Sequence, residues 1–492
     1  MSEEMEAPNP GLLALAAGFE AASRADWMAL VEEDIGPGSV ASLATATADG
    51  ISIGPIYSSA DRVGETTPGM PGLSPHTRGS TLTGPVDGSW DVRALVSDSS
   101  TSAANASALD ELKNGSTSLL IDPMAIGLSS PEDLAAVLEG IHLEMAGVWI
   151  LPSPKSAEIA RWLLDLWDRR GVAASDRLGG LGIDPLGVAA RYGTPPEFSS
   201  DLAVLVAATN DAPGVRAITV DSTPYAESGA TEAWELAYSL ATGVAYLRDL
   251  TEAGLGVDTA LDSLTFTYSA DTDQFTTISK LRAARRLWGR VATACGAELT
   301  RWAQTQHALT SAAALTRRDP WVNLLRNTVA AFSAGIGGAQ AVTVRPFDSA
   351  VGCPDEFGRR TARNTQLLLT EESNLGRVVD AAGGSWYVEE LTELLAEAAW
   401  DRFRTVEASG GMAAVLRDGS AAAEVDAAWA AQEVRIAGGD QPVIGVSVHA
   451  DPAETPLERV PPPSPSGPFP LRRRSAALEM VVPHADDAEE SS

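Results

Sequence analysis

The sequence predicts an α/β protein whose centre is a (β/α)8 TIM barrel, in which eight parallel strands are surrounded by helices. Between about residues 90 and 400, short apolar runs alternate with helical patterns, as they do in a repeated strand–helix unit. Eight candidate strands can be counted here, and eight is the number that closes such a barrel. The flanking sequence lacks this alternation. We therefore expect an extended N-terminal arm, and a C-terminal helical extension followed by a Pro-rich tail.

The candidate strands are short runs of aliphatic, β-branched and aromatic residues bounded by turn-forming sequence. They lie at residues 92–96, 118–121, 148–151, 181–184, 217–220, 264–268, 342–344 and 386–388.

Two helices between these strands can be read in detail. Ser130 is a suitable N-cap, and Pro131 suits the first helical position after it. A second helix is indicated by apolar residues that recur at i, i+3, i+4, i+7 and i+8 and form one stripe. These residues are Ile159, Trp162, Leu163, Leu166 and Trp167. Because such a stripe faces the core, we expect both tryptophans to pack there.

Composition divides the chain into four segments. Residues 1–84 contain one clear helix pattern, around Trp27, and are otherwise turn-rich, so we expect an arm that lies on another surface. Residues 85–412 hold the barrel. Residues 413–448 form an alanine-rich helical extension, and residues 449–492 form a Pro-rich linker with an acidic tail.

Charge and cysteine content exclude several classes of function. The 492 residues carry a formal net charge of −31, which argues against a nucleic-acid partner because phosphate contacts need a clustered positive surface. Cys295 and Cys353 are too few for a disulfide framework and are not spaced as metal ligands. The N-terminus is acidic, and no apolar run reaches the roughly 20 residues of a membrane span. We expect a cytoplasmic protein that binds neither membrane nor metal.

Four long runs have a residue order too specific to be explained by packing alone. They are ELAYSLATGVAYL at 235–247, SKLRAARRLWGRV at 279–291, LTRRDPWVNLLRNTVAAFSAGIGGAQ at 315–340 and RRTARNTQLLLTEESNLGRVVDAAGGSWYV at 359–388. These runs resemble segments of the methylmalonyl-CoA mutase family, and DGISIGPIYSSAD at 49–61 resembles its N-terminal region. The resemblance implies a barrel in which a radical from adenosylcobalamin rearranges an acyl-CoA away from water.

The same resemblance implies that this chain lacks the family's reactive side chains. Leu95 stands where the family has a tyrosine after the first strand, and Gly182 replaces a glutamine at the end of the fourth. Pro224 replaces the histidine that polarises the substrate carbonyl, and Thr343 replaces a second histidine. These side chains do not serve as general acids or bases. We therefore expect no catalytic residue at these degenerate positions.

The positions of the histidines and the absence of the family's cofactor-loop motif also indicate a chain without catalytic residues. The resemblance implies that the histidines of this chain fall outside the expected pocket, and none follows the family's D-x-H-x-x-G pattern for a cobalt ligand. They are His76, His142, His307, His449 and His484. We expect no cofactor to be bound by this chain. Arg93, Glu227 and Gln340 do match the family's pocket, so they form either a remnant of it or supports of the fold.

The implied function is that of the non-catalytic small subunit of a heterodimeric methylmalonyl-CoA mutase, which interconverts methylmalonyl-CoA and succinyl-CoA. The expected partner is the large catalytic subunit, which binds adenosylcobalamin and which this chain would stabilise. We also expect the N-terminal arm to form much of the heterodimer interface, and the barrel axis to be narrower than in a catalytic subunit.

Two alternatives stay open at this point. One is a catalytic barrel subunit of an acyl-CoA mutase, similar to isobutyryl-CoA mutase, with its cobalamin-binding domain on a separate polypeptide. Leu95, Gly182 and Pro224 count against it. The other is an orphan barrel with an unrelated binding role.

Overall fold

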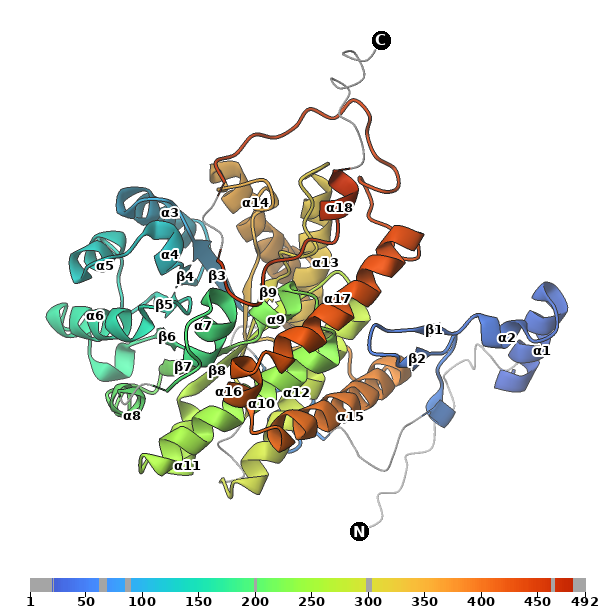
Figure 1. Ribbon diagram of the computed structural model, residues 1–492, viewed down its shortest axis with the longest axis horizontal. Helices are drawn as coiled ribbons and strands as arrows, with labels where there is room; N and C mark the ends of the chain where they lie inside the picture. The colour runs from blue at the N-terminus through green and yellow to red at the C-terminus, as the bar shows by residue number, and fades with distance from the viewer. Residues whose placement is uncertain are drawn as a thin grey trace, which may run out of the picture. The chain divides into compact units, whose positions relative to one another are not determined.

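Eight parallel strands close into a barrel at the centre of the computed structural model, which describes residues 20, 22–61, 69–84, 90–198, 201–297, 303–461 and 465–480 (Figure 1). The barrel confirms the predicted fold class. Its strands follow one another in chain order, and β10 pairs back to β3. They are β3 (Asp91–Val96), β4 (Ser118–Ile121), β5 (Gly147–Ile150), β6 (Gly179–Ile183), β7 (Val215–Asp221), β8 (Leu264–Ala270), β9 (Gln306–Thr310) and β10 (Ala341–Thr343).

The eighth predicted strand, at residues 386–388, is wrong. These residues begin α15 (Trp386–Ala408), whose N-cap is Ser385. The Tyr387 ring packs 5.1 Å from the ring of Phe275, so its aromatic character serves helix packing and not a sheet. The strand that completes the barrel is β9, which the sequence reading missed.

Helices cover the barrel between its strands. They are α3 (Thr101–Lys113), α4 (Pro123–Ile126), α5 (Pro131–Val137), α6 (Ser156–Arg169), α7 (Pro185–Tyr192), α8 (Leu202–Ala207), α9 (Thr223–Glu227), α10 (Glu232–Glu252), α11 (Val257–Asp262), α12 (Gln274–Ala294), α13 (Val322–Ile336) and α14 (Glu356–Leu367). Short helical turns lie at η2 (Ala174–Asp176), η3 (Leu368–Glu372) and η4 (Leu375–Arg377).

The two helices read from the sequence form as predicted. Ser130 caps α5 through a capping box with Asp133, and Pro131 occupies the first turn. In α6 the apolar stripe faces inward, and Trp167 is fully buried. Trp162 is only half-buried. Its predicted core position is therefore met in part, because it lies at the margin of the stripe.

The described residues up to Tyr57 belong to a separate compact unit, and Ser58 begins the second. The first unit contains α1 (Arg24–Ile35), α2 (Ser39–Ser42) and a hairpin of β1 (Thr45–Ala46) with β2 (Ser52–Ile53). None of the residues of α1 is buried. A short turn, η1 (Ser59–Asp61), opens the second unit.

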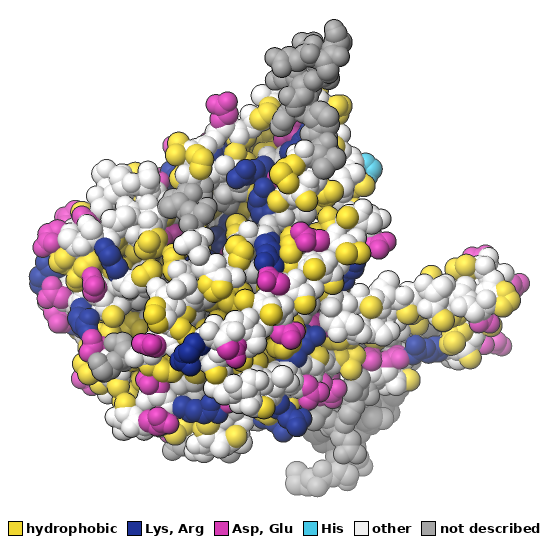
Figure 2. Space-filling model, in the orientation of Figure 1, with side chains coloured by type: hydrophobic (Ala, Val, Ile, Leu, Met, Phe, Trp, Pro, Cys, Tyr) yellow, Lys and Arg dark blue, Asp and Glu magenta, His cyan; other side chains and the backbone are white. Residues whose placement is uncertain are grey.

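Beyond α15 the chain forms α16 (Met412–Arg417) and α17 (Ser420–Gly438), and α18 (Ala476–Glu479) follows the Pro-rich segment. Acidic and basic side chains are interspersed over the face seen in Figure 2, and neither sign gathers into one large field there. Within the described ranges, each helix is too short or too polar to cross a bilayer.

Candidate functional site

An arginine and a tryptophan from two strands of the barrel contact each other. The Arg93 guanidinium of β3 lies 3.8 Å from the centre of the Trp149 ring of β5. Because only β4 lies between these two strands, the contact reaches past one strand along the wall of the barrel. Gly180 of β6 leaves room for the indole, since a Cβ there would lie 2.3 Å from the ring. The Trp149 indole is therefore packed between Arg93 and the backbone of Gly180.

Arg93 is held in place by neighbours at the amino-terminal ends of the strands. Its guanidinium donates to the Asp91 carboxylate at 2.8 Å and to the Ser118 hydroxyl at 3.1 Å. Burial lowers the pKa of Arg93, while Asp91 opposes that shift. The side chain matches the family's pocket, and here its guanidinium contacts Asp91, Ser118 and Trp149.

His307 lies in the same interior layer, which corrects the expectation that every histidine falls outside the pocket. Thr343 pairs in register with Leu309 on the strand of His307, and the strand of Thr343 also pairs with β3, which carries Arg93. The His307 Nε2 atom lies 2.8 Å from the Thr343 hydroxyl oxygen, and its Nδ1 atom lies 3.3 Å from that of Thr267. Burial lowers the pKa of His307 well below its usual range, with Arg93 and Arg345 adding to the effect. The ring is therefore neutral, and one nitrogen donates while the other accepts.

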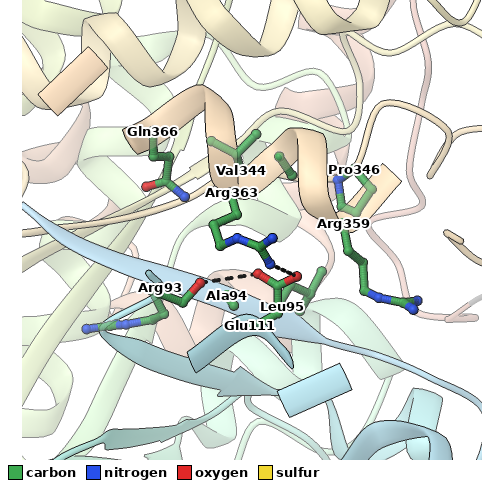
Figure 3. Close-up of a pocket in the computed structure, with 11 residues that line it drawn as sticks. Arg93, Ala94, Leu95, Glu111, Val344, Pro346, Arg359, Arg363 and Gln366 are labelled. Atoms are coloured by element: carbon green, nitrogen blue, oxygen red, sulfur yellow. Dashed lines mark hydrogen bonds and ion pairs between the residues drawn. The ribbon is translucent and has the colours of Figure 1, made fainter. Parts of the chain in front are cut away.

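Leu95 lies beside a very small cavity between β3, α3 and α14 (Figure 3). The cavity has a volume of about 10 Å³, which is room for about one water molecule. The Glu111 carboxylate on its wall forms an ion pair with Arg363, at 2.7 Å, and accepts a hydrogen bond from the Ser116 hydroxyl at 3.2 Å. The cavity beside this degenerate position has room for a solvent molecule and not for an acyl-CoA.

Gly182 occupies a backbone conformation that excludes a side chain. Its φ is +67°, in the left-handed region, and a Cβ would lie 2.2 Å from the Ile150 carbonyl oxygen. The register between β6 and β7 also shifts between Gly180 and Ile183. The loss of the family's glutamine is thus built into the path of the strand.

Pro224 is buried in the first turn of α9, next to a cluster of charges at the carboxyl ends of the strands. The Arg345 guanidinium donates to the Glu227 carboxylate at 2.7 Å. Arg191 donates to the Asp221 carboxylate at 3.0 Å and lies 3.9 Å from the Glu227 carboxylate. Two cations and two anions therefore satisfy one another at the mouth of the barrel.

The C-terminal segment lies over this mouth. Its backbone N–H at Arg472 donates to the Glu227 carbonyl at 2.9 Å, and the ring of Phe469 packs edge-on against Tyr225 with 4.9 Å between centres. Arg474 forms an ion pair with Asp271, just beyond β8. Although burial opposes it, this pairing lowers the pKa of Asp271. The tail, drawn in red in Figure 1, is thus fastened across the carboxyl ends of the strands.

Gln340 lies at the other end of the barrel. It precedes β10, and its side-chain oxygen accepts from the Gln306 backbone N–H at 2.7 Å. Glu227 follows β7, so a strand of about 3.3 Å per residue separates the two ends. The structure does not bring Arg93, Glu227 and Gln340 together into one pocket.

A larger cavity, of about 220 Å³, lies beyond the ends of β5 and β6. It is lined by the turns that lead into α6 and α7 and by α8, with Ser153, Ile183 and Leu202 among its walls. None of the degenerate or matching site residues lines it.

Comparisons with known proteins agree with the motifs. Residues 46–125 and 121–465 match the family described as methylmalonyl-CoA mutase. The methylmalonyl-CoA mutase small subunit of Streptomyces virginiae is 44% identical over 97% of this chain and 79% of its own length. That of Propionibacterium freudenreichii subsp. shermanii is 38% identical over 89% of this chain and 70% of its own. The large subunit of Streptomyces virginiae is 32% identical over 88% of this chain and 63% of its own length.

Proposed function

The chain belongs to the methylmalonyl-CoA mutase family, and on that premise we propose that it is the non-catalytic small subunit of a heterodimeric mutase. Its role is to stabilise the large subunit, which binds adenosylcobalamin and interconverts methylmalonyl-CoA and succinyl-CoA. Relatives named as small and large subunits of methylmalonyl-CoA mutase support this assignment.

The observation that carries the proposal is the closed mouth of the barrel. A reactive site must leave its acids, bases and hydrogen-bond donors available to the substrate. Here Glu227 is paired with Arg345 and Arg191, and Arg191 is paired with Asp221. The backbone of the tail lies over these groups. A side chain already committed to such a pair supports the fold more readily than it binds an acyl-CoA.

Adenosylcobalamin does not fit this mouth. Phe469 and Tyr225 pack against each other there, and the Arg472 backbone donates to Glu227. The imidazole of His307 is enclosed within the barrel by Thr267 and Thr343. We therefore place the cofactor on the large subunit and derive no catalytic step from this chain.

Reconstitution tests the proposal. The purified chain, assayed alone with methylmalonyl-CoA and adenosylcobalamin, is expected to show no turnover and to retain no cobalamin through gel filtration. Co-expressed with the mutase large subunit of its source organism, it is expected to co-purify and to raise the melting temperature of that subunit.

Turnover by the chain alone contradicts the proposal. Turnover that requires only an added cobalamin-binding polypeptide, without the large subunit, selects the alternative of a catalytic barrel subunit.

A further inference from the structure

Two neighbouring barrel helices, α13 and α14, expose apolar side chains on their outer surfaces. Trp321, Leu325 and Val329 recur every four residues and form one stripe along α13, with Trp321 52% and Leu325 67% exposed. Phe357 lies on α14, and Leu368, which follows α14 and begins η3, lies three helical turns further along and is 48% exposed. The Trp321 and Phe357 ring centres are 6.2 Å apart, so the two stripes adjoin.

This α13–α14 face is poor in charge along α13. Charged residues make up 21% of the chain, so a helix of 15 residues with average composition carries about three. Helix α13 has one, Arg326, whose guanidinium donates to the Thr316 hydroxyl, the Asn323 side-chain oxygen and the Ile444 carbonyl. The outer positions of a barrel helix that faces water are ordinarily polar.

The buried centre of a protein interface is rich in aromatic side chains and arginine and poor in other charged residues. Here the guanidinium of Arg360 lies over an aromatic ring of the face, 5.4 Å from the centre of the Phe357 ring. Contiguous apolar patches of this kind mark interaction sites on soluble domains. The aromatic part of the face is ordered by its own packing, because Trp321 also stacks on Phe347 with 4.8 Å between ring centres. A rigid aromatic anchor loses little conformational entropy when a partner covers it.

The partner that fits this face is a protein of the same fold. A small and a large mutase subunit from one organism are both similar to this chain, at 44% and 32% identity. The large subunit therefore carries helices equivalent to α13 and α14. Two related subunits can bury equivalent faces against each other about an approximate two-fold axis, as identical subunits do about an exact one.

We propose that the α13–α14 face, defined by Trp321, Leu325, Val329, Phe357 and Leu368, binds the large mutase subunit. The inference rests on the proposed function and names the surface through which it operates. It concerns the barrel itself and is independent of the N-terminal arm.

Substitutions that introduce a charge on the α13–α14 face test whether this face binds the large subunit. Leu325→Glu and Leu368→Glu each bring a carboxylate into the contact, and both positions are exposed enough to leave the core unchanged. Val204→Glu is the matched control, because Val204 is 66% exposed on α8. Affinity for the large subunit of the source organism is measured by titration calorimetry, and circular dichroism checks that each variant melts like the wild type.

We expect the dissociation constant to rise at least tenfold for Leu325→Glu and Leu368→Glu and to change less than twofold for Val204→Glu. Wild-type affinity in both face variants overturns the inference while leaving the proposed function intact. A self-association of the chain that Leu325→Glu abolishes, with heterodimer affinity unchanged, assigns the face to a second copy and overturns it as well. If the wild-type chain itself fails to bind the large subunit, the proposed function fails first.

Discussion

The His307 Nε2 atom lies 2.8 Å from the Thr343 hydroxyl oxygen, deep inside the barrel. Thr343 stands where the family resemblance implies a histidine, and the imidazole is found on the neighbouring strand β9. Both of its nitrogens are occupied by threonine hydroxyls. The barrel thus contains a histidine near the expected place, but one that is bound to its neighbours.

The His307–Thr343 contact predicts a loss of stability when the hydroxyl is removed. Thr343→Val keeps the shape of the side chain and leaves the buried Nε2 atom without a partner, which costs about 1–3 kcal/mol in the free energy of unfolding. Urea denaturation measures this change in the free energy of unfolding. Thr405→Val, on the exposed face of α15, is the control and is expected to change the value by less than about 0.5 kcal/mol. Equal effects for the two variants would show that the contact contributes nothing.

A side chain at position 182 is expected to lower the stability of the folded protein strongly. Gly182→Ala forces a Cβ against the Ile150 carbonyl oxygen in a left-handed backbone, so we expect a loss of more than about 3 kcal/mol or no folded protein. Gly171→Ala is the matched control, because Gly171 has φ +69° with nothing within 4 Å of a Cβ. Gly171→Ala is expected to lose only the free energy of the left-handed backbone strain, about 1–2 kcal/mol. Thermal melting of both variants separates the effect of the steric collision from that of backbone strain. Equal losses of stability in the two variants would argue against the collision.

Asp184 predicts a pH dependence near neutrality. Burial raises the pKa of its carboxyl to about 7, although hydrogen bonds from the Tyr246 hydroxyl and the Gly187 and Asp221 backbones oppose the shift. Between the ordinary value of 3.8 and about 7, the folded state holds a proton that the unfolded state has lost. The contribution of this group to stability is therefore full below pH 4 and is lost as the pH rises to about 7.

The corresponding measurement is a carbon-13 NMR titration of the carboxyl groups. Tyr246→Phe removes one donor to the Asp184 carboxylate, so its titration is expected to move above pH 7. Asp133 serves as the reference, because hydrogen bonds from Ser129 and Ser130 lower its pKa and Tyr246 is not among its partners. A midpoint for Asp184 near 4 in the wild type would contradict the prediction.

The ion pair between Arg474 and Asp271 predicts how the tail is held. Arg474→Ala leaves the Asp271 carboxylate largely buried without its cation, so the segment from residue 465 to 474 should detach more often. Limited digestion with chymotrypsin is then expected to cleave after Leu471 at least several-fold faster. Arg404→Ala is the control, since Arg404 and Asp401 form an exposed pair that contributes little. Unchanged cleavage of the Arg474 variant would mean that the pair does not fasten the tail.

The helices and strands predicted correctly share one property, which is that a few adjacent residues determine them. Ser130 and Pro131 start α5 by local hydrogen bonding and a preset φ. The inward stripe of α6 follows from helical periodicity alone. The four degenerate positions could also be named from the sequence, because they are defined by residue identity within recognisable motifs.

Strand β9 and residues 386–388 show where local pattern fails. Gln306 and His307 look unlike strand residues in isolation, yet inside the closed barrel their side chains find partners on β8, β10 and the adjoining helix. Trp386 and Tyr387 favour a strand by propensity, but the Ser385 cap and the packing on Phe275 make them the start of a helix. Propensity was overridden by contacts with residues far away in the chain.

The fold class, most of the strands and the residues at the four degenerate positions can be read from the sequence, because each depends on the identity and spacing of neighbouring residues. Only the tertiary structure decided that His307 lies beside Thr343, that Gly182 has no room for a Cβ, and that the tail covers the charges around Glu227. Each of these relations joins segments that meet only when the barrel closes. For His307 and for the charges around Glu227, the physical cause is the satisfaction of buried polar groups by distant partners. For Gly182, it is the close approach of the neighbouring strand β5.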